Sequence, residues 1–142
     1  RHGTVRVHTE DGCQKCGGAY HRLYTSAHND RRLVVFLEGS SKKFWTTNVK
    51  NIAANVTTRS SFSSCIAATS VARGNSEEAR ALVTVGHQPW DGWPIAIFIE
   101  EAGGMVTDHC GRPWTANDCS NLIAAANEID HKNLLIYLGG EK

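Results

Sequence analysis

The sequence predicts an α/β protein in which helices pack on a mixed β-sheet. Short apolar runs rich in β-branched residues, typical of buried strands, are interspersed with longer segments of helical pattern. Capping residues and glycines separate these segments. With 142 residues, of which 41% are hydrophobic and 20% charged, the chain is long enough to bury a core. We therefore expect residues 1–142 to form a single domain.

The amino-terminal part is predicted to begin with strands. Residues 4–9 alternate between apolar and polar side chains, and a glycine-containing turn at 17–19 leads to a second strand at 20–25, which indicates a hairpin. Residues 33–37 form a short apolar run that predicts a buried strand. The segment 39–41, Gly-Ser-Ser, follows at its carboxyl end, where open α/β sheets bind ligands.

Two helices are expected next. A ligand role for the segment 39–41 is one interpretation, and Ser41 as the cap of a helix over 42–54 is the other; the sequence leaves both open. Small residues in 59–74 predict a helix that packs closely on a neighbour and ends at Gly74. The amino terminus of this helix is suited to a phosphate or a hydroxyl, because its first N–H groups have no partner within the helix.

The carboxyl-terminal part continues the alternation of strands and helices. Strands are predicted at 81–85, 105–107 and 122–126. Asn127 and Asp130 cap a final helix that ends at the glycine pair 139–140.

Asp91 stands at the predicted start of the helix 94–102, which the glycine pair 103–104 ends. This helix is apolar on most sides, so we expect it to be buried. Asp91 is interpreted as its N-cap. A carboxylate in that position either caps the helix only or also binds a cation, and the local sequence leaves both roles open.

Charge and hydropathy exclude several function classes. The net charge of +1 gives no basic face of the kind that nucleic-acid-binding proteins carry. The small clusters at 31–32 and 42–43 are interpreted as solvated surface. Because no long apolar stretch or signal peptide is present, we expect no membrane association and a cytoplasmic location.

The five cysteines suit a reducing compartment better than a disulfide framework. Cys13 and Cys16 have the spacing of half a zinc site, but no second pair repeats it, and His87 and His109 would have to complete the set. A zinc-stabilised structural domain is therefore kept as one alternative. The histidines at 87, 109 and 131 are interpreted as surface or loop residues, because no nucleophile lies near them in sequence.

The segment 89–108 resembles the Trp-Asp and Glu-Ala-Gly-Gly region of the inositol monophosphatase family, which are magnesium-dependent phosphatases. Trp90-Asp91 lies at the family's distance from the segment 101–104 and from Gly111-x-Pro113. The resemblance implies the carboxyl-terminal half of the layered αβαβα fold. It also implies that Asp91 is a magnesium ligand that helps to hold the substrate.

The same resemblance assigns substrate contacts to Ser40, Arg59 and Ser63, together with Asp91. Two positions depart from the family pattern. Phe62 stands where a glycine is expected, so that its ring is expected to close the pocket, and Thr84 stands where some members have a substrate-binding glutamate. The family's Glu-Glu pair and Asp-Pro-x-Asp-Gly-Thr loop are absent before Asp91, so the amino-terminal metal-binding half is missing and no catalytic set is complete in this chain.

Two functions follow as expectations. In the first, the chain contributes one metal ligand and part of the substrate pocket to a magnesium-dependent phosphomonoesterase. The chain is then expected to be inactive, and to bind Mg²⁺ only when the missing half is present. In the second, it is a truncated, non-catalytic relative that acts as an oligomeric binding or assembly module, with a second copy covering the exposed seam. A small phosphorylated metabolite is the expected ligand, and a homodimer is the expected assembly.

Overall fold

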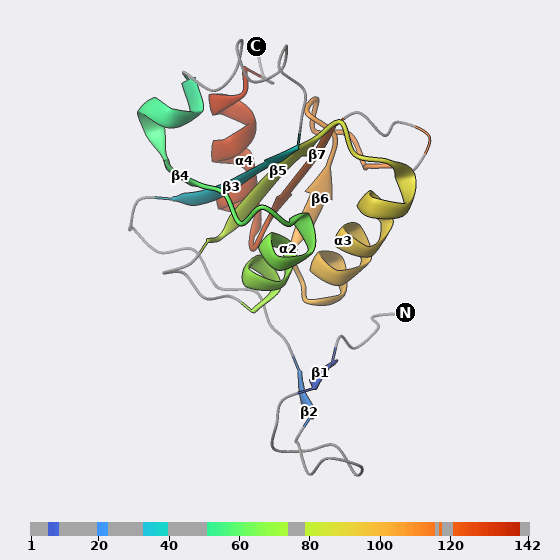
Figure 1. Cartoon of the computed structure of the whole chain (residues 1–142). Helices are drawn as coiled ribbons and strands as arrows, with labels where there is room; N and C mark the ends of the chain where they lie inside the picture. Colours follow the sequence, from blue (N-terminus) through green and yellow to red (C-terminus); the bar gives the residue numbers. More distant parts are fainter. Residues whose placement is uncertain are drawn as a thin grey trace.

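A computed structural model describes residues 6–8, 20–22, 33–39, 51–73, 79–115, 117 and 121–139. Strands β1 (Arg6–His8) and β2 (Tyr20–Arg22) pair antiparallel and form the predicted hairpin. The other strands form one five-stranded sheet in the order β4-β3-β5-β7-β6 (Figure 1). The predicted α/β class with a mixed sheet is confirmed.

The sheet joins a parallel part to an antiparallel part. Strand β3 (Val34–Gly39) pairs parallel with both β4 (Thr57–Arg59) and β5 (Ala81–Val85). Strand β7 (Asn121–Ala125) pairs antiparallel with β5 and with β6 (Met105–Thr107). Strand β4 was not predicted, because its three residues are exposed at the sheet edge and carry no apolar pattern.

Helices cover both faces of this sheet. Helices α2 (Ser64–Ala72) and α3 (Pro89–Glu101) lie on one face, and α4 (Glu128–Tyr137) lies on the other (Figure 1). Residues 51–55 are also helical and overlap the end of the helix predicted at 42–54.

The core is divided by the sheet into two buried clusters, because neighbouring strand residues point to opposite faces. One cluster joins the sheet to α2 and α3, and the other joins it to α4. The strand residues of the first include Phe36, Leu82, Leu122 and Ala124, and those of the second include Val35, Val83, Ile123 and Ala125.

The start of α3 differs from the prediction. The helix begins at Pro89 with Gln88 as its N-cap, so Asp91 is the third helical residue and not the cap. Pro89 explains the difference, since proline fits the first helical position and its missing N–H has no partner there anyway. Pro94 therefore lies inside the helix. The predicted end is confirmed, because Gly103 follows with a φ of 94°.

The expectation that α3 is buried on most sides is wrong. Its inner face, with Ile95, Ala96 and Ile99, packs on the sheet. Trp90, Trp93 and Ile97 are 70%, 50% and 51% exposed on the outer side. A single sheet covers only one side of a helix, so the opposite side of the helix can stay exposed even when its sequence is apolar.

Helix α4 follows the prediction at its amino terminus. The Asn127 side chain accepts a hydrogen bond from the backbone N–H of Asp130. The expectation that His131 is a surface or loop residue is wrong. His131 lies in α4 and is buried, with Nε2 at 2.8 Å from Oγ1 of Thr107 on β6. The helix turns this residue toward the sheet, which the sequence position did not reveal.

None of the helices in the described part of the chain is long and apolar enough to cross a membrane. The cytoplasmic location stays a prediction.

Candidate functional site

A pocket of about 240 Å³ opens where β3 and β5 end and where α2 and α3 begin. We call it the site pocket. Parallel β3 and β5 bring their carboxyl ends to one edge of the sheet, the place where α/β folds bind ligands. It is lined by Gly39, Ser63, Ser64, Cys65, Thr84, Val85, Gly86, His87 and Asp91.

The first turn of α2 supplies one wall of the site pocket. Ser63 is the N-cap, and its Oγ accepts a hydrogen bond from the backbone N–H of Ile66 at 3.5 Å. The first N–H groups of a helix point away from its body and carry partial positive charge. This wall is therefore suited to an anion.

Asp91 supplies a negative charge on the opposite wall. Its Oδ2 accepts a long hydrogen bond of 3.4 Å from the backbone N–H of Gln88, which ties the carboxylate to the helix start. Asp91 is exposed and lines the site pocket. The carboxylate thus helps to cap α3 and still has lone pairs to offer to a ligand or cation.

Gly39 brings the end of β3 into close contact with β5. It has a φ of 108°, and a Cβ there would lie 1.9 Å from the carbonyl oxygen of Val85. Only glycine permits both the conformation and the approach. The narrow floor of the site pocket depends on it.

The floor of the site pocket carries two hydroxyl groups. Thr84 is buried, and its Oγ1 lies 3.5 Å from Oγ of Ser64. Two neighbouring hydroxyls donate and accept hydrogen bonds but add no charge. The described lining of the site pocket therefore contains a single carboxylate, that of Asp91.

The structure brings together two of the four predicted substrate contacts, Ser63 and Asp91. Arg59 ends the edge strand β4, is exposed, and is not among the residues that line the site pocket. Ser40 lies outside the described residues. The substrate roles of all four residues stay predictions.

Phe62 does not close the site pocket. Its φ is +57°, a left-handed conformation that glycine adopts readily, and its side chain is 95% exposed. The backbone thus keeps the shape expected of a glycine position while the ring points into solvent. The expectation that the ring fills the pocket is wrong for this reason.

Glu38 holds the turn before α2, a role that no motif in the sequence predicts. The carboxylate is 5% exposed and accepts hydrogen bonds from the backbone N–H and the Oγ of Ser61, the latter at 2.8 Å. It thereby joins the end of β3 to the segment that carries Phe62 and Ser63. The available signal in the sequence was a glutamate directly after the apolar run 33–37 and directly before Gly39.

His87 packs beneath the start of α3. Its ring centroid lies 5.9 Å from that of Trp114, and both imidazole nitrogens are buried with no hydrogen-bond partner among the described residues. Burial lowers the pKa of His87, and the nearby charge of Asp91 opposes that shift. Burial of the ring therefore favours its neutral form.

The described residues do not make a complete metal site. They contain no group of three or more His, Cys, Asp or Glu side chains placed to hold an ion. Magnesium in a two-ion hydrolase needs further oxygen ligands besides one carboxylate. Cys13 and Cys16, the proposed half of a zinc site, lie outside the described residues.

Comparisons with known proteins decide the kinship of this arrangement. No family model matches the chain. The crystal structure of extragenic suppressor protein SuhB from Bartonella henselae superposes with a TM-score of 0.71 at 25% identity, over 87% of this chain and 50% of that one. The chain is similar to the inositol monophosphatases over half of their fold.

Two inositol monophosphatases agree with this similarity. The enzyme of Zymomonas mobilis matches the fold with a TM-score of 0.73 at 17% identity, over 86% of this chain and 49% of the other. Inositol-1-monophosphatase ImpA of Mycolicibacterium smegmatis is 39% identical over 54 residues, which are 38% of this chain and 19% of that protein. The chain spans about half the length of the inositol monophosphatase structures that it matches. This is consistent with the predicted carboxyl-terminal half.

Proposed function

We propose that this chain forms the carboxyl-terminal half of a magnesium-dependent phosphomonoesterase site, with Asp91 as one metal ligand and the start of α2 as part of the phosphate-binding wall. The observation that carries the proposal is that Ser63 and Asp91, from helices separated by β5, line one pocket. An anion-binding helix start facing a carboxylate suits a phosphate that shares a cation with the protein.

The remaining ligands must come from another polypeptide segment. The described residues offer Asp91 but no metal-binding group of three, so the chain by itself is proposed to be inactive. A segment that completes the site has to approach Asp91, and the exposed rings of Trp90 and Trp93 stand beside it. We propose that this segment covers them.

The metal role is tested with Mg²⁺ and inorganic phosphate as probes. Asp91→Asn is expected to abolish any magnesium-dependent binding of phosphate by the chain and to cost about 1 kcal/mol of stability or less, because only a long capping bond is weakened. Glu100→Gln, which removes a carboxylate elsewhere on α3, is the matched control and should bind as the parent does. Magnesium-dependent phosphate binding that is measurable in the parent and equally strong in Asp91→Asn would remove Asp91 from the metal site.

Phosphate release from a phosphomonoester tests the inactivity of the isolated chain. We expect no magnesium-dependent release above the level of Asp91→Asn. Turnover by the parent chain alone would mean that residues outside the described part complete the ligand set, and would contradict the need for a second half.

A second candidate is the non-catalytic assembly module, in which a second copy covers the exposed apolar side of α3. The exposure of Trp90, Trp93 and Ile97 favours it, since large apolar side chains grouped at a surface mark contact sites. Light scattering on the purified chain tests this function. A stable dimer that Trp93→Ser dissociates supports it, and a monomer excludes it.

A further inference from the structure

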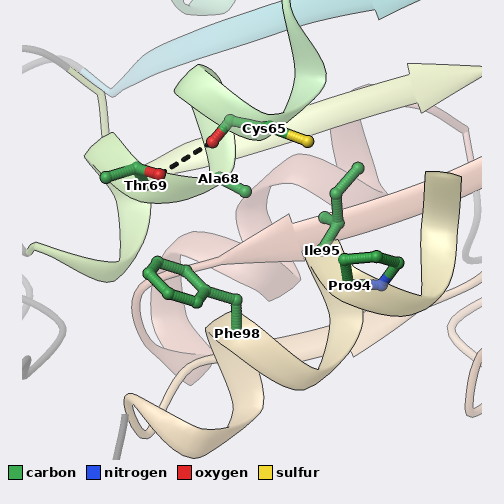
Figure 2. A pocket seen from close by; sticks show the side chains of 6 residues that line it. All are labelled: Cys65, Ala68, Thr69, Pro94, Ile95 and Phe98. Carbon is green, nitrogen blue, oxygen red and sulfur yellow. Dashed lines mark hydrogen bonds between the residues drawn. The ribbon is translucent and has the colours of Figure 1, made fainter. Parts of the chain in front are cut away.

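A second pocket lies one helical turn along α2 and α3 from the site pocket. It has a volume of about 210 Å³ and is lined by Cys65, Ala68, Thr69, Pro94, Ile95 and Phe98 (Figure 2). We call it the apolar pocket. Cys65, Ala68 and Thr69 belong to α2, and Pro94, Ile95 and Phe98 belong to α3, so the pocket lies between the two helices (Figure 2).

The two pockets share a wall. Cys65 lines both of them. On α2, Ser64 lines the site pocket and Ala68, one turn later on the same side, lines the apolar pocket. On α3, Asp91 and Ile95 stand in the same relation. Both helices therefore change from polar to apolar side chains along one groove.

The apolar pocket offers little polar chemistry. The hydroxyl of Thr69 donates to the carbonyl oxygen of Cys65 at 2.8 Å within α2 (Figure 2), so its proton is already used. The other lining side chains are hydrocarbon apart from the thiol of Cys65. A cavity of about 150 Å³ with such a lining accepts a benzene ring. The apolar pocket is therefore large enough for an aromatic ring or a short alkyl chain.

We infer that the ligand of this site is a phosphomonoester with an apolar ester group, whose phosphate lies in the site pocket and whose apolar group passes Cys65 into the apolar pocket. The inference rests on the proposed function, because it places the phosphate at the start of α2. Thr84 supports it from the other end. Its side chain at the pocket floor is a neutral hydroxyl, so this position offers no charged acceptor for an ester group that is rich in hydroxyls.

The thiol of Cys65 provides the assay, because it is exposed at the junction of the two pockets. The rate at which iodoacetamide alkylates Cys65 is measured by peptide mass spectrometry in the presence of phenyl phosphate, methyl phosphate or phenol. Cys110, also an exposed free thiol, lines neither pocket and is the internal control. Phenyl phosphate should protect Cys65 at a concentration about tenfold lower than either fragment requires, and should not protect Cys110.

A side chain that fills the apolar pocket should remove the stronger protection by phenyl phosphate. Thr69→Phe places a ring in the apolar pocket and is expected to bring phenyl phosphate to the level of methyl phosphate, while Ile97→Phe on the outer side of α3 leaves it unchanged. Thermal melting verifies folding, and Thr69→Leu replaces Thr69→Phe if the larger side chain unfolds the protein.

The outcomes separate the two proposals. Equal protection by methyl and phenyl phosphate overturns the apolar ester group and leaves the phosphate site standing. If phenol protects Cys65 as well as phenyl phosphate does, both proposals are overturned, because the phosphate group then contributes nothing to binding in the site pocket. Protection of Cys65 by none of the three also overturns both.

Discussion

Nη1 of Arg80 lies 3.5 Å from Oδ2 of Asp130, and each side chain is only 1% exposed. Arg80 immediately precedes β5, and Asp130 lies in the first turn of α4, so the pair joins a central strand to the helix behind it. Nδ2 of Asn127 donates to the same carboxylate oxygen at 2.7 Å. The amino terminus of α4 is thus held both by its own cap and by a buried ion pair.

Removal of one partner of this pair is expected to destabilise the protein strongly. Asp130→Ala leaves the guanidinium of Arg80 buried without its carboxylate, which typically costs about 3–5 kcal/mol. Urea unfolding measures the loss. Glu128→Ala, which removes the exposed Glu128–Lys132 pair of the same helix, should change stability little. Similar losses for both variants would show that the burial of the Arg80 pair carries no energetic weight.

Gly92→Ala should destabilise the protein although it lies inside a helix. Helix propensity alone favours alanine by about 1 kcal/mol. A Cβ at Gly92 would however lie 2.6 Å from Cζ2 of Trp114 and 2.7 Å from Nε2 of His87. Overpacking of this kind costs about 1–3 kcal/mol, so we expect a lower melting temperature. His87→Ala added to Gly92→Ala should recover part of the loss, and a stabilised single variant would contradict the close packing.

Phe62→Gly is expected to stabilise the protein slightly. The φ of +57° is costly for a residue with a Cβ, by about 1–2 kcal/mol, and the ring is 95% exposed and contributes little packing. The greater freedom of glycine in the unfolded chain offsets about half of this gain. Phe62→Ala, which removes the ring and keeps the Cβ, is the control and should not stabilise. Equal melting temperatures for both variants would mean that the backbone at position 62 is not strained.

Protonation of His131 should weaken the protein in mild acid. Burial lowers the pKa of His131 below the ordinary value of 6.5. The unfolded chain therefore takes up the proton first as the pH falls, and the stability present above pH 6.5 is progressively lost below it. Burial also lowers the pKa of His87, which acts in the same direction.

The variant His131→Gln isolates this contribution. Its amide keeps a donor near Oγ1 of Thr107, and the fall in urea stability between neutral and mildly acidic pH should become shallower. His109→Gln, at an exposed position, should leave the slope unchanged. A parent slope that persists in His131→Gln would assign the acid sensitivity to other groups.

Local sequence predicted the elements whose signals are local. Strands β5 and β6 and the Asn127 cap of α4 were predicted closely, because apolar runs, β-branched residues and capping side chains act within a few residues. The start of α3 was misplaced because two prolines offered alternative first turns, and Pro89 took that position. Strand β4 was missed because it forms by pairing with β3 at the sheet edge and has no pattern of its own.

The candidate site was predicted in part. Ser63 and Asp91 were chosen from a family resemblance, and the parallel pairing of β3 and β5 places both at one pocket. Glu38 and His87 were not predicted for this site, because their environments depend on chain segments distant in sequence. The exposure of Phe62 was also decided by a turn conformation that the residue type disfavours.

Local patterns in the sequence suffice to predict the α/β class, most of the strands and helices, and the kinship with half of the inositol monophosphatase fold, because periodicity, caps and motif spacing are properties of neighbouring residues. Which side chains are buried, and which of them come into contact, follows from the packing of the elements in three dimensions. Arg80 finds Asp130 through the packing of α4 behind the sheet, and Cys65 joins two pockets because α2 and α3 lie against each other. Such contacts depend on how elements that are distant in sequence pack together, and no local sequence pattern encodes that packing.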